Sequence, residues 1–123
     1  MAQSTYLRNK ILDAVVNATS FSVAQVYVSL HTGDPGATGA SEVAGGSYIR
    51  KAASFGAASG GSAALDAAVE FSGMPSCTVT HVGFWDAESS GNFLQGGALT
   101  AQKVVAAGDT FRFAVGALTD SQS

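Results

Sequence analysis

Apolar and polar positions alternate along several short stretches of the chain, and this period of two predicts β-strands. The stretch 26–31 (VYVSLH) places a large aliphatic residue at every second position, so one of its faces is expected to be buried. The stretch from Cys77 to Asp86 (CTVTHVGFWD) has β-branched or aromatic residues at nearly every position and predicts a central strand. Large apolar groups on both of its faces require cover on both sides, from a second sheet and a helix or from another subunit.

Weaker patterns predict further strands over residues 48–55, 69–71, 93–100 and 110–118, with glycine-containing turns between them. Gly96-Gly97 indicates a bulge in the third of these. The stretch 63–68 is compatible with a short helical turn or an irregular connection, and residues 120–123 form a polar tail.

A helix is predicted near the N-terminus, from about residue 5 to about residue 17, with Ser4 or Thr5 as its cap. Its apolar positions have helical spacing and comprise Leu7, Ile11, Val15 and Ala18, widened by Leu12 and Val16. Such a helix packs across the face or the open end of a sheet, or serves as an arm that docks onto a neighbouring subunit.

These elements predict one domain, residues 1–123, with a helix at about 5–17 and a β domain at about 22–119. The expected class is mainly β. One helix followed by about six to eight short strands is typical of an antiparallel β-sandwich or barrel, jelly-roll-like, with one N-terminal α-helix.

The loop 33–46 contains five glycines, an Asp34-Pro35-Gly36 turn and one large apolar side chain, Val43. A loop of this length with so little to bury runs over the surface or is ordered by something outside its own domain. We predict that a neighbouring subunit orders it.

Charged residues make up 12% of the chain, well below the usual value of about 25%, and the net charge is −3. A surface with so little charge favours burial against other subunits. The six basic residues are dispersed, which excludes a nucleic-acid-binding patch, and no apolar run or signal segment indicates a membrane. The single cysteine, Cys77, fits synthesis in a reducing cytoplasm.

No arrangement of residues predicts catalysis, so an enzyme is not expected. His31 and His81, with Asp34 or Asp86, form a metal site only if their strands are adjacent, and no ligand spacing supports one. We therefore expect no metal and no cofactor. Four aromatic residues offer either a binding platform or, more commonly, core and subunit interface: Tyr48, Phe84, Trp85 and Phe93.

Three blocks of the sequence, Leu30–Arg50 (LHTGDPGATGASEVAGGSYIR), Thr80–Asp86 (THVGFWD) and Ala107–Thr110 (AGDT), resemble a family of small structural proteins of tailed bacteriophages. Members of that family are described as capsid decoration or cement proteins, minor tail proteins or tail-fibre proteins. The resemblance implies a place in the virion and carries over no catalytic residue.

A lone domain without a coiled coil or shaft repeat favours a decoration protein on the capsid surface, which self-associates, as a trimer, and binds the major capsid protein. The alternative within this class is a tail, baseplate or tail-fibre protein. A different class is a carbohydrate- or receptor-binding module that uses the loop 33–46 with Trp85 or Tyr48. The candidate interface residues are Asp34, Pro35, Gly36, Glu42, Tyr48, Arg50, Trp85 and Phe93.

Overall fold

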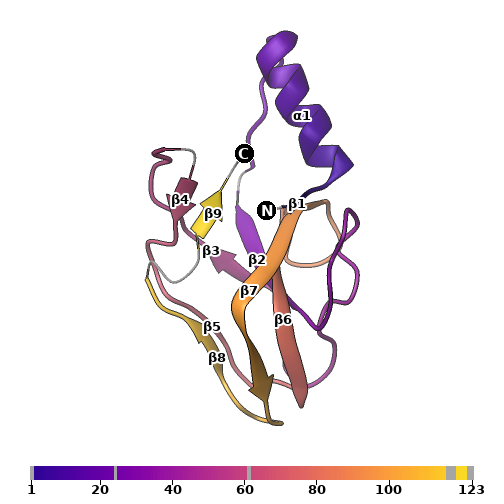
Figure 1. Ribbon diagram of the computed structural model, residues 1–123, viewed down its shortest axis with the longest axis vertical. Coiled ribbons are helices and arrows are strands. Elements are labelled where there is room, and N and C mark those ends of the chain that lie inside the picture. The colour runs from indigo at the N-terminus through magenta and orange to yellow at the C-terminus, as the bar shows by residue number, and fades with distance from the viewer. Residues whose placement is uncertain (1, 24, 61, 116–118, 122–123) are drawn as a thin grey trace.

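The computed structural model describes residues 2–23, 25–60, 62–115 and 119–121 (Figure 1). Along the chain the elements are β1 (Ala2–Gln3), α1 (Thr5–Val16), β2 (Val26–His31), β3 (Lys51–Ala53), β4 (Ser62–Ala64), β5 (Val69–Phe71), β6 (Cys77–Trp85), β7 (Phe93–Val105), β8 (Phe111–Phe113) and β9 (Thr119–Ser121). The protein is mainly β with one N-terminal helix, as the pattern of the sequence predicts.

The strands form three antiparallel sheets, which confirms the sandwich-like class. A five-stranded sheet has the order β1-β7-β6-β2-β3, and two smaller sheets pair β4 with β9 and β5 with β8. β6 lies in the middle of the large sheet, as its composition predicts. The large sheet ends in two edge strands, β1 and β3, so in the described part of the chain the sandwich alternative fits better than a closed barrel.

The core lies between the inner face of the large sheet and the β5–β8 pair. Val28 is opposite Phe84 and Leu30 is opposite Val82, so these four side chains share one face. They belong to one buried cluster with Phe71 and the other apolar residues of β5 and β8, and Phe71 makes edge contacts with Phe111 and Phe113. Burial of these aliphatic and aromatic side chains stabilises the packing of the β5–β8 pair against the large sheet.

The helix begins and ends close to the predicted bounds. Ser4 caps it, because its Oγ accepts a hydrogen bond from the Leu7 N–H at 3.1 Å. Leu7 is buried and Ile11 is half-buried, whereas the large apolar residues of the last two turns are exposed. The predicted apolar stripe therefore covers the sheet only along its N-terminal half.

Several strand boundaries differ from the prediction. The stretch 48–55 contains only β3, and of the stretch 110–118 only β8 is a strand, with residues 116–118 outside the described part. β9 includes Asp120 and Ser121 of the predicted polar tail and pairs with β4. These short strands have too few residues for a period of two, and pairing with a partner distant in the sequence defines them.

The predicted bulge at Gly96-Gly97 is wrong. Gly96 pairs in register with Gly83, and Gly97 pairs with Val82. The register shifts occur instead on either side of this segment, between Val79 and His81 and between Phe84 and Trp85 on β6. Among the described residues, no helix is long and apolar enough to cross a membrane.

Candidate functional site

The loop 33–46 folds back over the outer face of the large sheet. The Val43 N–H donates to the Leu30 carbonyl at 2.8 Å, and the Thr32 N–H donates to the Ser41 carbonyl at 3.0 Å. Pro35, Gly39 and Val43 are buried. The outer face of β6 is thus covered by this loop, and the chain itself supplies the contacts that define the path of the loop. Ordering of this loop by a neighbouring subunit, as expected from the sequence, stays a prediction.

The Asp34-Pro35-Gly36 turn forms as predicted. The Asp34 Oδ1 accepts a hydrogen bond from the Gly36 N–H at 2.9 Å, and Gly36 has a φ of +61°, which glycine adopts without strain. The Pro35 carbonyl accepts from the N–H groups of both Gly39 and Ala40. The loop is therefore a compact turn structure with Pro35 pointing toward the sheet.

Glycines allow the loop and the strands to approach closely. A Cβ atom at Gly83 would lie 2.7 Å from both the His31 Nε2 and the Ser29 Oγ, and one at Gly96 would lie 2.7 Å from the Pro35 Cγ. Both distances are too short for a real contact. The glycines thus leave a slot on the outer face that the surrounding side chains fill.

A buried chain of hydrogen bonds runs through this slot. The His31 Nδ1 lies 2.8 Å from the Ala40 carbonyl and must donate to it, so the Nε2 accepts from the Ser29 Oγ at 2.6 Å. The Ser29 Oγ in turn accepts from the Trp85 Nε1 at 2.8 Å. Desolvation by burial lowers the pKa of His31, which agrees with a neutral ring held by these partners.

An ion pair fixes the end of the loop. The Arg50 guanidinium donates to both carboxylate oxygens of Glu42 at 3.0 Å, and the Tyr48 hydroxyl donates to the Glu42 Oε2 at 2.8 Å. The same hydroxyl accepts from the Leu30 N–H at 2.9 Å, and burial raises the pKa of Tyr48. Glu42 is thereby bound to β2 through Tyr48 as well as to Arg50.

Arg50 also connects the loop to the turn between β6 and β7. Its Nη1 donates to the carbonyls of Ala87 at 3.1 Å and Ser90 at 2.8 Å. Its Cζ lies 3.5 Å from the centroid of the Trp85 ring, a cation–π contact. Trp85 packs edge-on against Phe93, with ring centroids 5.2 Å apart. One guanidinium therefore joins the loop to the end of β6 and to the turn that follows it.

The structure brings six of the eight predicted interface residues together in this cluster: Pro35, Glu42, Tyr48, Arg50, Trp85 and Phe93. Asp34 and Gly36 lie at the exposed turn. The contacts described above are all within one chain. Contact of these residues with a neighbouring subunit stays a prediction.

The prediction missed Ser29, His31 and Gly83 as parts of this cluster. The alternation of β2 and β6 places all three on the same face as Trp85, and that signal was available in the sequence. The alternation does not predict that the loop 33–46 folds over that face.

The two histidines do lie on adjacent strands, opposite one another in the β2–β6 register. Both ring nitrogens of His31 are used in the hydrogen bonds above, and the His81 Nδ1 lies 2.8 Å from the Thr80 Oγ1. The described residues contain no group of three or more His, Cys, Asp or Glu side chains that could hold a metal ion.

Among the described residues, the candidate aromatic side chains form no exposed platform on this face. Trp85 is 8% exposed and Phe93 is 5% exposed, and Tyr48 is half-buried with its hydroxyl in two hydrogen bonds. An open groove of about 360 Å³ lies beside Tyr48 and Arg50, and the turn residues 88–90 form its other wall. The site is thus a largely buried, hydrogen-bonded cluster beside an open groove that Glu42, Arg50 and residues 88–90 help to line.

The family described as "Podophage GP4 fiber I protein gp80" matches residues 2–121, nearly the entire chain. The chain belongs to this gp80 family. No curated protein matches the chain. Membership of the gp80 family makes the protein a structural protein of a bacteriophage virion, and it confirms that part of the resemblance seen in the sequence.

Proposed function

We propose that this gp80-family protein is a non-catalytic building block of a fibre on a podophage particle, and that it acts by assembling with further copies of itself and with other virion proteins. The observation that carries the proposal is the family match, which spans residues 2–121 and describes fibre proteins. The fold supports it, because the chain is a small, internally braced β module.

The internal cluster supports the proposal, because its hydrogen bonds brace the module from within. The ion pair of Glu42 with Arg50 and the hydrogen-bond chain from His31 to Trp85 tie a 14-residue loop to β2, to β6 and to the residue that precedes β3. In the part of the chain that is described, no buried side-chain nitrogen or oxygen lacks a hydrogen-bond partner. Fully satisfied polar networks rigidify a fold and specify a single arrangement.

Decoration of the capsid surface, with binding to the major capsid protein, is the function that the sequence alone favours. The description of the gp80 family favours a fibre instead. Carbohydrate or receptor binding through the loop needs Trp85 or Tyr48 exposed together with polar groups. Trp85 is buried and Tyr48 is half-buried, which disfavours this alternative.

Immunogold electron microscopy of intact particles tests the proposal. Antibodies raised against the purified protein are expected to label fibres at the tail, and antibody preabsorbed with the same protein serves as the control. Label spread over the capsid faces overturns the fibre assignment in favour of decoration. Label absent from intact and gently disrupted particles overturns both.

A further inference from the structure

The second half of α1 carries an apolar face that nothing in the described chain covers. Leu12 is 56% exposed, Val15 is 74% exposed and Val16 is 68% exposed. At about 100° per residue these three form a strip beside the one that holds Leu7 and Ile11. In Figure 1 the C-terminal turns of α1 project beyond the end of the large sheet. The helix therefore has a wide apolar arc, of which its own domain covers only one side.

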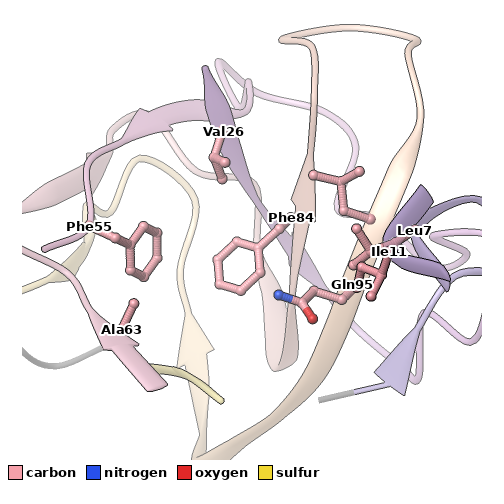
Figure 2. Close-up of a pocket in the computed structure, with 8 residues that line it drawn as sticks. Leu7, Ile11, Val26, Phe55, Ala63, Phe84 and Gln95 are labelled. Atoms are coloured by element: carbon pink, nitrogen blue, oxygen red, sulfur yellow. The ribbon is translucent and has the colours of Figure 1, made fainter. Parts of the chain in front are cut away.

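An apolar groove runs alongside the same helix. It has a volume of about 270 Å³ and is walled by Leu7 and Ile11 of α1, by Phe84 of β6, and by Phe55 and Ala63 from the opposite side (Figure 2). The groove lining contains no charged side chain among the described residues, and Gln95 is its one polar member. Its occupant must therefore be apolar.

The groove and the bare face are parts of one surface. Ile11 lines the groove, and Val15 follows it one turn later on the exposed side of α1. A ridge of aliphatic side chains thus lies next to a groove with aliphatic and aromatic walls. We call the two together the α1 surface, defined by Ile11, Leu12, Val15, Val16 and the groove walls Phe55 and Ala63.

We infer that the α1 surface binds a second copy of this chain, with the α1 ridge of one copy in the groove of the other. This inference rests on the proposed role as an assembling fibre component. The same molecule supplies both the ridge and the groove, and surfaces that complement each other on one chain lead to self-association. Ridge side chains alone are far too few for a stable interface of about 800 Å² per partner, so the groove must take part.

The charge distribution favours the same occupant. α1 carries Arg8, Lys10 and Asp13, a net charge of +1, and the rest of the chain therefore carries −4 of the total of −3. The helix of one copy is attracted to the body of another, which steers the encounter and disfavours contact between two bodies. The small share of charged residues in the whole chain also favours association between copies.

Replacement of exposed ridge residues tests the inference without disturbing the core. Light scattering coupled to gel filtration is expected to show an oligomer for the wild-type protein. Leu12→Asp combined with Val15→Asp is expected to shift it to monomer, because two buried carboxylates weaken the contact by about tenfold or more. Val104→Asp is the matched control, since Val104 is 80% exposed on β7 and distant in sequence from the α1 surface. This control is expected to keep the wild-type mass.

A second variant acts on the groove alone. Ala63→Leu fills the groove from β4 and leaves α1 unchanged, so it is expected to weaken association by a similar factor while circular dichroism stays that of the wild type. A wild-type protein that is monomeric throughout the measured range overturns the inference, as does an oligomer whose mass neither variant changes. Either result leaves the labelling of the particle untouched, so failure of this contact and failure of the fibre assignment are distinguishable.

Discussion

Gly83 lies where β6 passes closest to the side chains of β2, and its missing side chain makes room for the hydrogen bonds of His31 and Ser29. In Gly83→Ala, the new Cβ would also lie 2.9 Å from the Phe93 ring. Overpacking of this kind destabilises by about 1–3 kcal/mol. Urea unfolding followed by tryptophan fluorescence is expected to show this loss.

Gly56→Ala is the matched control for that substitution. Gly56, like Gly83, lies outside the left-handed region, and its nearest neighbour to a new Cβ is the Ala64 carbonyl oxygen at 3.9 Å. Alanine at this position is expected to be neutral or to stabilise by about 0.4–1 kcal/mol through the unfolded state. Equal losses for both variants would contradict the role of Gly83 as a space-making residue.

His31 is expected to make the protein less stable in mild acid. Its pKa is lowered from 6.5 by burial, so below about pH 6.5 the unfolded chain binds a proton that the folded chain resists. Stability is then complete above that pH and declines as the pH falls toward the lower folded pKa. Urea unfolding measured between about pH 7.5 and about pH 5.5 tests this, since most carboxylates titrate lower, near pH 4.

Two histidine variants separate this effect from the general response to acid. His31→Gln removes the titrating ring, so its stability is expected to change little over the same pH window, although it starts from a lower value. His81→Gln keeps the ring of His31 and is expected to retain the decline. A decline of the same size in wild type and His31→Gln would show that other groups cause it.

At the scale of elements, the ion pair of Arg50 with Glu42 holds the loop 33–46 on the sheet. Both side chains are largely buried, with exposures of 9% and 23%. Arg50→Lys keeps the charge but loses the two-point contact with the carboxylate and the packing on Trp85. The expected loss is about 1–3 kcal/mol. Hydrogen exchange at the Thr32 and Val43 amides, which bond within the loop and to β2, is expected to accelerate.

The chain offers a matched ion pair for comparison. Arg112 and Glu70 contact each other at 3.2 Å across β8 and β5, but their side chains are 54% and 60% exposed. Arg112→Lys is therefore expected to change stability by less than about 1 kcal/mol and to leave the loop amides protected. If the two substitutions behave alike, the loop is held by its backbone hydrogen bonds and not by Arg50.

The elements that the sequence predicts well are those whose pattern is local. β6 is apolar on both faces and lies at the centre of the sheet, and α1 has a capping serine and a helical apolar stripe. The elements that it misses depend on distant partners. β1 has two residues that pair with Gln95 and Gly96, and β9 uses polar residues that pair with β4. Two or three residues are too few to show an alternation of apolar and polar positions, so such strands become evident only from their pairing in the folded chain.

The candidate site was predictable only where its residues are close in sequence. The residues Glu42, Tyr48 and Arg50 are close in sequence, but their meeting with Trp85 requires β3, β2 and β6 to be neighbours. Glycine content alone does not distinguish a mobile loop from one that packs closely, and here Gly39, Gly83 and Gly96 are positions of close approach.

At the scale of the whole molecule, self-association through the α1 surface is expected to make thermal stability depend on concentration. A partner that binds only the folded chain raises stability by mass action, so Tm should rise with protein concentration. Scanning calorimetry or fluorescence over about a hundredfold range of concentration measures this dependence. The double variant of Leu12 and Val15 should show a Tm that does not change with concentration, because it no longer associates. These side chains are exposed in the single chain, so their replacement should affect its own core little. The Val104→Asp control should retain the slope, and a flat Tm for the wild-type protein would argue against association through α1.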